Sequence, residues 1–480
     1  MTRAMPPSGP GRRRSTKRAT LPLPSPLPDL PIPALPSLPI PMPSLRPTPS
    51  HSDEVHNERM IRGDSVAMGA INAASTFLPV FIARVGGSAF EVGLLTAIPA
   101  VFAVLLAIPF GQVLQRQTRI VAWYSRGRLF GHLGYAAMAV IVVTLPPELA
   151  VPAILVVWAI ASVPQTIGIV AFPVVMDGAA GPRGRLELMS RRWSIMGVTS
   201  AVVVTLVGVT LDLLPFVAGY ALMFTGFAIA GVVSYQFSSR YRVAAHGTES
   251  ASRASLWERI RGVGAIARAN PAFLSYSARQ LVYIAGVRLT LPLIPLYFVR
   301  ELHAPDVWIG IIATAQSAAL LVGYLYWRRQ ARVRGRKFML LTTLLVSSLY
   351  PVAISLTGNL LVVAVLAAVA SLFSAGVDLA LFDELMDRIP RQYGVTFTAL
   401  DTTFANTATI IAPLLGAAIA EAIGIQDALR IGSIITLTSV ALFAWDIRNR
   451  QKNALQKALA QSSDVPLVRR QPPDGRPRRP

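Results

Sequence analysis

The sequence contains no cysteine, few acidic residues and few charges of any kind. Among 480 residues there are 24 Asp and Glu against 45 Lys and Arg, and only 14% of the residues are charged. The absence of cysteine excludes a disulfide framework and a thiolate metal site. The low charge, together with 53% hydrophobic residues, excludes an ordinary soluble domain and predicts a polytopic membrane protein.

Two further kinds of site are missing from the sequence. The five histidines show no paired helical spacing of the kind that binds a metal, and no glycine-rich loop ends in Gly-Lys-Ser or Gly-Lys-Thr to hold a nucleotide phosphate. We therefore expect no metal, no cofactor and no enzymatic activity. Pumping driven by ATP would need a separate subunit.

The chain repeats itself once. The segment FLPVFIAR at residues 77–84 matches LIPLYFVR at residues 293–300, and a glycine follows each segment at Gly93 and Gly310. The two glycines are 217 residues apart. A near-constant offset across a hydrophobic chain predicts two parallel halves, each a membrane bundle, which is how many secondary transporters are built.

About twelve apolar segments of roughly 20 residues lie between residues 63 and 447, each long enough to cross about 30 Å of hydrocarbon as a helix. The expected fold is an all-α membrane protein with two parallel-related six-helix bundles. The predicted spans are 63–85, 90–114, 127–146, 149–174, 193–213 and 215–236 in the first half, and 272–299, 307–327, 338–357, 359–382, 395–422 and 426–447 in the second. The predicted divisions are an arm at 1–58, bundles at 59–236 and 272–447, a cytoplasmic linker at 237–271 and a basic tail at 448–480.

The predicted arm is basic at its start and then rich in proline, which recurs almost every second or third residue from Pro22 to Pro49. Proline lacks the backbone N–H and fixes φ, so neither helix nor sheet can propagate there. We expect a disordered arm and no cleavable signal peptide, because the prolines interrupt any apolar core. An over-extended gene start, with Met60 as the alternative start, and docking of a partner that binds proline-rich segments are the alternatives.

Arginine and lysine gather in alternate loops of the predicted bundles. The loops after the second, fourth, sixth and eighth spans are basic, whereas the opposite loops hold little beyond Arg84, Arg300 and Arg430. Because cationic loops stay in the cytoplasm, both termini are predicted to be cytoplasmic and the membrane to be the plasma membrane. This placement accounts for the net charge of +21 without a nucleic-acid partner, and the basic tail could touch anionic lipid headgroups.

The chain resembles the major facilitator superfamily in its twelve spans, its two parallel halves, its long central loop and a motif after the second span. The family motif runs glycine, three residues, aspartate, arginine, one residue, glycine, arginine. This sequence keeps Gly111, Arg116 and Arg119 but has Gln115 for the aspartate and Thr118 for the second glycine. The resemblance implies a transporter that rocks its two halves about a central substrate path.

A second copy of the motif follows the eighth span. It keeps Gly335, Arg336 and Lys337 at the matching end, with Arg332 where the aspartate would stand. In the family, the loop aspartate is thought to help hold the halves together on the cytoplasmic side. Because Gln115 cannot supply that ion pair, we expect other charges to replace it.

The loop between spans four and five is basic, whereas its counterpart between spans ten and eleven is acidic. Arg191 and Asp401 are 210 residues apart, so they occupy equivalent positions in the two halves. We hypothesise an electrostatic latch of Arg191 and Arg192 against Asp383, Glu384 and Asp401. The alternative is that the arginines only set the topology and the acids only solvate a loop, since exposed pairs contribute about 0–1 kcal/mol.

The resemblance places the substrate path between the halves, lined by spans one, four, seven and ten. The polar residues deep in those spans are Asn72, Gln165, Arg288 and Asp378. Arg288 lies about 24 Å beyond the cytoplasmic start of its helix, too deep to reach that surface. We expect Arg288 to bind an anionic or hydrogen-bonding group of the substrate, with a structural ion pair as the alternative.

Arg279 and Asp401 complete the candidate site, and Asp378 has a second expected role. Arg279 precedes Arg288 by nine residues and so lies on the opposite face of its helix, where a structural charge cluster is its expected role. Asp378, and with it Asp401, is the candidate for proton coupling, because a carboxylate that faces each side in turn could carry a proton in each cycle. The alternative for Asp378 is a permanent ion pair with Arg279.

We therefore predict a monomeric secondary transporter that moves a small molecule across the plasma membrane by alternating access with proton coupling. Export of amphipathic compounds by proton antiport is slightly favoured by a cavity with few charges. The fifth span lacks the glycine-proline signature of many drug/proton antiporters, which weakens that preference. Proton-coupled uptake is the first alternative, and a receptor or scaffold derived from a transporter is the second.

Overall fold

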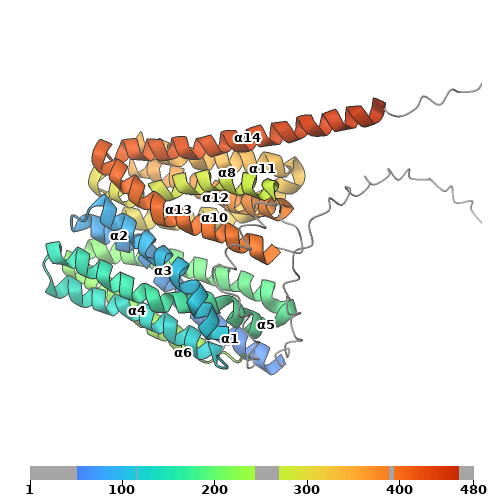
Figure 1. The fold of residues 1–480 in the computed structure, drawn as a ribbon. Helices are drawn as coiled ribbons and strands as arrows, with labels where there is room; N and C mark the ends of the chain where they lie inside the picture. The colour runs from blue at the N-terminus through green and yellow to red at the C-terminus, as the bar shows by residue number, and fades with distance from the viewer. Residues whose placement is uncertain (1–50, 116, 244–269, 389–393, 464–480) are drawn as a thin grey trace, which may run out of the picture. The chain divides into compact units, whose positions relative to one another are not determined.

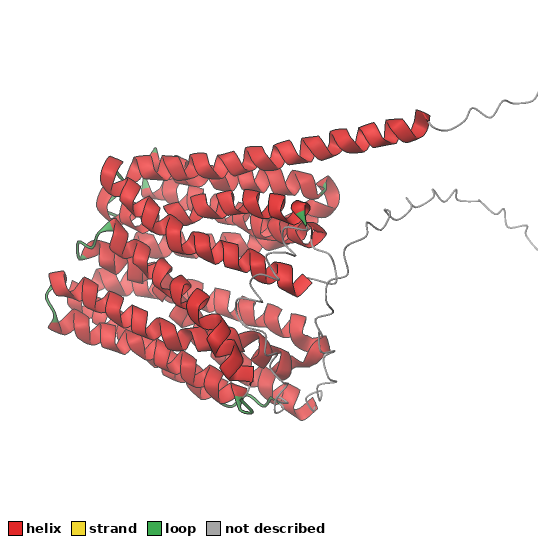
Figure 2. Cartoon of the chain, in the orientation of Figure 1, coloured by secondary structure: helices red, strands yellow, loops and turns green. Residues whose placement is uncertain are grey.

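The computed structural model describes residues 51–115, 117–243, 270–388 and 394–463. Residues 1–50, the motif residue Arg116 and residues 244–269, which hold most of the predicted linker, lie outside the described residues. Every regular element within the described ranges is helical (Figure 2). Twelve of these helical segments are long and apolar enough to cross a membrane, which confirms the predicted fold class.

The helices follow one another along the chain in the order shown in Figure 1. The first half contains α1 (His51–Asn72), α2 (Ala74–Arg84), α3 (Ala89–Gln115), α4 (Ile120–Thr144), α5 (Pro147–Leu213) and α6 (Phe216–Ser238). The second half contains α8 (Pro271–Thr290), α9 (Leu293–Leu296), the π-helical turn η1 (Tyr297–Glu301), α10 (Asp306–Arg334), α11 (Arg336–Ser355), α12 (Leu360–Arg388), α13 (Gly394–Ile423) and α14 (Ile425–Ser463).

The first span of each half is interrupted at an equivalent place. Helix α1 ends at Asn72 and α2 begins at Ala74, whereas α8 ends at Thr290 and α9 begins at Leu293. Each break comes shortly before the proline of the repeated segment, and such prolines remove a backbone hydrogen bond from the helix. Together these pieces make the spans Ser52–Arg84 and Pro271–Glu301.

The basic segment between the fourth and fifth predicted spans is helical rather than an irregular loop. Helix α5 runs through it over 67 residues and contains the spans Pro147–Ala179 and Leu188–Leu213. The Arg192 guanidinium lies 5.1 Å from the centre of the Phe172 ring, although 20 residues of straight helix would separate them by about 30 Å. The helical run therefore turns back on itself between its two spans.

Two ends of the helical region also differ from the predicted divisions. Helix α1 begins at His51, so the last eight residues assigned to the arm are helical. Helix α14 continues to Ser463, well past the predicted end of the twelfth span at residue 447. Both extensions are polar helical ends, which a count of apolar residues does not detect.

The halves contact each other through α3 with α13 and through α5 with α10. Glycines of the repeat permit this close approach: a Cβ at Gly93 would lie 3.3 Å from the Pro413 carbonyl oxygen, and one at Gly310 would lie 3.1 Å from that of Val204. Small residues are favoured where membrane helices meet because they let the backbones come close. The repeated glycines therefore mark equivalent contacts on the two halves.

Candidate functional site

A cavity of about 410 Å³ lies among α8, α12 and α13 of the second half. It brings together three of the ionisable residues that the sequence singles out, Arg288 from α8, Asp378 from α12 and Asp401 from α13. The aromatic side chains of Tyr276 and Tyr283 also line the cavity. The cavity thus combines one cation and two carboxylates with apolar and aromatic surface, a composition suited to a small organic molecule with polar groups.

Arg288 is the deepest charge in this cavity. It follows the start of α8 at Pro271 by 17 residues, or about 26 Å of helix, and its side chain is half-buried. No described residue forms a hydrogen bond or an ion pair with its guanidinium. A guanidinium at this depth has five donors available for a ligand.

The two carboxylates have neutral partners. Asp378 accepts a hydrogen bond of 2.8 Å from the Tyr324 hydroxyl, and Asp401 accepts one of 3.3 Å from the Gln280 amide. Neither carboxylate forms an ion pair with a described arginine or lysine. A carboxylate held by a neutral donor can lose or gain a proton without breaking an ion pair.

The other two predicted cavity residues lie elsewhere. Asn72 is exposed at the end of α1 and is not among the residues that line this cavity. Gln165 packs against Gly131 of α4, where a Cβ would meet the Gln165 Cγ at 2.2 Å. The structure therefore gathers the second-half candidates into one cavity and leaves the first-half candidates outside it.

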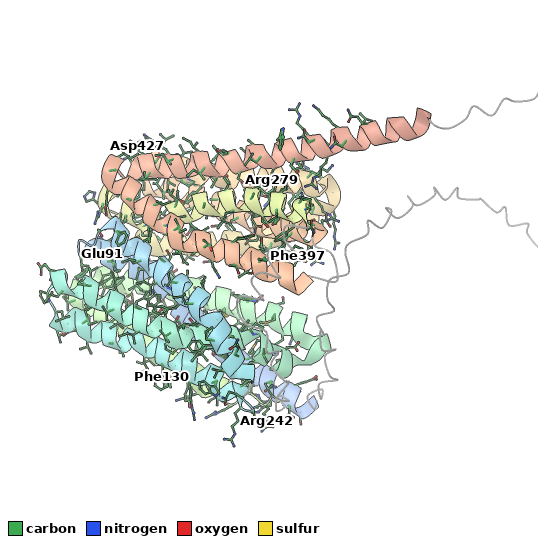
Figure 3. All side chains as sticks on the ribbon, viewed as in Figure 1. Glu91, Phe130, Arg242, Arg279, Phe397 and Asp427 are labelled. Atoms are coloured by element: carbon green, nitrogen blue, oxygen red, sulfur yellow. The ribbon has the colours of Figure 1, made fainter. Side chains whose placement is uncertain are left out.

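Arg279 lies away from the cavity, on the side of α8 that contacts α14 (Figure 3). It is 5% exposed and forms an ion pair of 3.3 Å with Asp446. The sequence alternative, a permanent pair between Arg279 and Asp378, is not formed in this structure. Asp446 also pairs with Arg388, so these residues form a charge cluster near the middle of α14.

The residues of the predicted latch have partners within their own halves. Arg191 pairs with Glu58, and Arg192 lies 3.7 Å from Asp64. In the second half, Asp383 pairs with Arg336 of the motif copy, Glu384 pairs with Arg388 and Arg450, and Asp401 binds Gln280. The cross-half pairs are not formed here, so the latch stays a prediction for a state in which these ends approach.

The motif residues lie at helix ends. Gly111 is half-buried in the last part of α3, and Arg119 is exposed immediately before α4. Gly335 joins α10 to α11 with φ of 85°, a conformation that favours glycine. Arg336, the next residue of the motif copy, forms an ion pair of 2.7 Å with Asp387 in addition to its pair with Asp383. Lys337 is exposed.

A buried ion pair in the first half was not foreseen from the sequence. Asp64 of α1 is fully buried and pairs with Arg128 of α4 at 2.8 Å. Ser234 and Tyr241 also donate hydrogen bonds to Asp64, at 2.7 and 2.9 Å. A single acid in an apolar span is itself a signal for such a site, but its partner could not be chosen among several arginines.

Two arginines of the repeat join the halves at the opposite end of the bundle. Arg84 donates to the Ala304 carbonyl oxygen at 2.6 Å, and Arg300 donates to the Gly87 carbonyl oxygen at 2.5 Å. Arg84 and Arg300 are 216 residues apart, and Gly87 and Ala304 are 217 apart. We call this pseudo-symmetric pair of contacts the arginine clasp; each half reaches into the equivalent loop of the other.

Asp306, at the start of α10, strengthens the clasp. Arg84 donates to its carboxylate through Nε and Nη2, both at 3.1 Å, and the Tyr220 hydroxyl lies 3.4 Å away. The carboxylate of Asp212 in turn accepts from the backbone N–H groups of Asp306 and Val307, at 2.9 and 3.1 Å. A residue of the first half therefore caps a helix of the second half.

The fold is that of a polytopic membrane protein, and the proteins to which it is similar include membrane transporters. A family model for the Major Facilitator Superfamily matches residues 277–473. With the fold of both halves, this match confirms the resemblance to that superfamily. None of the curated proteins matches the chain significantly.

Solved structures share the fold over most of this chain. A mutant of the nucleoside transporter NupG matches with a TM-score of 0.67 and 11% identity, over 81% of this chain and 99% of its own. A bacterial homologue of the iron transporter ferroportin, inward-facing, matches at 0.63 and 14%, over 81% and 98%. A bacterial homologue of the human lysosomal transporter Spinster, inward-facing and unoccupied, matches at 0.58 and 13%, over 82% and 95%.

Proposed function

We propose that this protein is a proton-coupled secondary transporter that carries a small organic molecule by alternating access. The observation that carries the proposal is the gathering of Arg288, Asp378 and Asp401, from three helices, in one cavity of about 410 Å³. Intramembrane ionisable residues that face a cavity mark substrate and ion pathways. A purely structural role for these residues would favour ion pairs among them, and none is formed.

Arg288 is proposed to bind an anionic or hydrogen-bond-accepting group of the substrate. Its guanidinium has no described partner, so a ligand would replace water rather than a protein carboxylate. The planar fork of an arginine suits a carboxylate or phosphate through two parallel hydrogen bonds. The tyrosines of the cavity offer apolar surface for the remainder of the molecule.

Asp378 and Asp401 are proposed to carry protons. Their partners, Tyr324 and Gln280, are neutral in the neighbouring helices α10 and α8. Protonation would therefore remove a negative charge from the cavity without leaving a cation unpaired. Protonation would thereby change the free energy of switching between the inward-open and outward-open states. Coupling of transport to a proton requires such a change.

The arginine clasp supports the alternating-access part of the proposal. The described hydrogen bonds between the halves lie at the clasp, at Asp212 beside it, or where Thr314 contacts Thr205 and the Ala201 carbonyl oxygen. The latch residues at the opposite end are bound within their own halves. We infer a state closed at the clasp end, and we propose that transport alternates between this clasp and the predicted latch, with export as the expected direction.

The test uses liposomes that contain the purified protein and an internal pH dye, with no imposed gradient. Organic acids, sugars, nucleosides and lipophilic cations are added outside. Internal alkalinisation on adding a compound indicates proton antiport, and acidification indicates symport. Arg288→Gln should abolish the response to the active compound, whereas Arg430→Gln, an exposed arginine paired with Asp427, should retain it.

The outcomes separate the parts of the proposal. Flux without a pH change would remove the proton coupling while keeping the transporter. A full response in Arg288→Gln would remove the assigned binding role. Silence across the panel, from protein that remains folded, would favour the receptor or scaffold alternative.

A further inference from the structure

A second cavity of about 450 Å³ lies in the first half, where α4 begins and α6 ends. The residues that line it include Arg119 directly before α4, Arg126 in its second turn, Tyr235 of α6 and Ser239 directly after α6. The predicted orientation puts this end of the bundle on the cytoplasmic side. The cavity shares no lining residue with the one that holds Arg288.

The charges at this cavity are of one sign. Arg119 and Arg126 are exposed, and neither forms an ion pair with a described residue. None of the lining residues is acidic. Helix α4 starts here without a side-chain cap on its N-terminus, where the first backbone N–H groups of a helix have no intrahelical partner and the helix dipole is positive.

Ser125 supplies a buried donor without a partner. It lines the cavity, is 0% exposed, and its hydroxyl forms no hydrogen bond with any described residue. A buried hydroxyl without a hydrogen bond costs about 1–3 kcal/mol. An anion with several acceptor oxygens would satisfy this hydroxyl together with the arginines and the start of the helix.

The floor of the cavity does not repel an anion. Tyr241 lines it and donates its hydroxyl to Asp64, which is bound by Arg128 and lies 3.7 Å from Arg192. Burial and the neighbouring Asp64 raise the pKa of Tyr241 well above its usual range, so its hydroxyl stays protonated. Arg128 and Arg192 thus balance the negative charge of Asp64, which would otherwise repel an anion in the cavity.

An exposed apolar stripe continues from the cavity along α4. Arg119, Trp123 and Arg126 are followed at helical spacing by Phe130 and Leu133 on the same face. Trp123 is 40% exposed, Phe130 60% and Leu133 39%, and Figure 3 shows Phe130 on the outer side of α4. Two cations with a tryptophan at one end of an exposed apolar face form the pattern of a membrane interface.

We propose that this cavity binds the phosphate headgroup of an anionic phospholipid in the cytoplasmic leaflet. Arg119 and Arg126 hold the phosphate with the start of α4 and the Ser125 hydroxyl, while the acyl chains follow the stripe past Phe130. The continuous apolar stripe favours a lipid over a free phosphate, because a soluble anion would gain nothing from it.

The test places the full chain in phosphatidylcholine vesicles that contain a minor fraction of brominated phosphatidylglycerol or, in parallel, brominated phosphatidylcholine. Bromine quenches nearby tryptophan, and the Trp123 signal is obtained by difference from Trp123→Phe. We expect the Trp123 signal to report a preference for phosphatidylglycerol of about fivefold or more, since one arginine near an anionic surface contributes about a fivefold change in binding. Arg119→Gln/Arg126→Gln should bring the preference to about one.

Arg328→Gln/Arg329→Gln is the matched control. It removes two exposed arginines of α10 on the same predicted side of the membrane, and it should leave the preference unchanged. Equal losses in both double variants would mean general attraction to the charged leaflet and would overturn the site. Ser125→Ala should lower the preference by less, without lowering the thermal stability of the protein in phosphatidylcholine alone.

A free anion is distinguished by adding inorganic phosphate at constant ionic strength. A phospholipid site predicts that Trp123 quenching by brominated phosphatidylglycerol persists. Relief of the quenching by inorganic phosphate would assign the cavity to a soluble phosphate and overturn the lipid proposal, as would equal quenching by the two brominated lipids in the wild-type protein.

Discussion

Removing the Arg84 side chain should release the end of the bundle that the arginine clasp holds closed. Arg84→Gln deletes two hydrogen bonds to the Asp306 carboxylate and alters one to the Ala304 carbonyl oxygen. The Asp306 side chain is only 9% exposed and would lose its cation. Hydrogen bonds to charged groups contribute about 1.5–3 kcal/mol, and the partial exposure of Arg84 places the total at about 2–3 kcal/mol.

A change of that size corresponds to about a 30- to 150-fold shift toward the state that is open at the clasp end. Arg300→Gln should shift the equilibrium less, by about fivefold, because its acceptor at Gly87 is a neutral carbonyl and its side chain is exposed. The two variants therefore compare how much the Arg84 contacts and the Arg300 contact each contribute to the clasp.

The absence of cysteine makes the measurement direct. A single cysteine introduced at Val287, which lines the cavity of Arg288, can be labelled by a membrane-impermeant thiol reagent from either side. In the background of Arg84→Gln, labelling from the clasp side should accelerate and labelling from the other side should slow. Arg430→Gln is the control, because among the described residues that arginine pairs with nearby Asp427 within its own helix. Unchanged labelling in Arg84→Gln, or equal acceleration in the control, would refute the reasoning.

Three further changes test separate parts of the structure. Gly208→Ala would place a Cβ 2.8 Å from the backbone oxygen of Asp306 and should accelerate labelling of the same cysteine from the clasp side, whereas Gly226→Ala, which meets nothing within 4 Å, should not. Asp64→Asn should lower the free energy of unfolding by about 3–5 kcal/mol, because it breaks a buried ion pair. Asp427→Asn should lower it by at most about 1 kcal/mol. Thermal unfolding in detergent measures both, and similar losses would argue against a buried network. Asp378→Asn should retain substrate exchange but lose accumulation driven by a pH gradient, and full pH-driven accumulation would exclude Asp378 as the carrier.

The sequence determined the architecture because the bilayer imposes it. A helix needs about 20 apolar residues to cross the hydrocarbon, so the number of spans can be counted. The repeat around Pro79 and Pro295 predicted two equivalent halves, and the same offset carried Arg84 and Arg300 to equivalent positions. The sequence did not reveal that each arginine would contact the other half, since no local pattern encodes a contact across the bundle.

The candidate site was predictable only in part. Arg288, Asp378 and Asp401 stand out because charges are costly within a span. Asn72 and Gln165 were expected in the same cavity, but the structure leaves them outside it. A membrane helix is apolar on nearly every face, so hydrophobic periodicity does not show which face points inward.

Tertiary packing decided the partners. Arg279 binds Asp446 rather than Asp378, and Asp64 binds Arg128, because the rotation of each helix about its axis depends on the small residues at its contacts. The same holds for the cavity beside Arg119, which exists only where α4 and α6 meet. The sequence by itself determined how many helices cross the membrane and which residues are costly there, while the packing of those helices decided which of the costly residues meet.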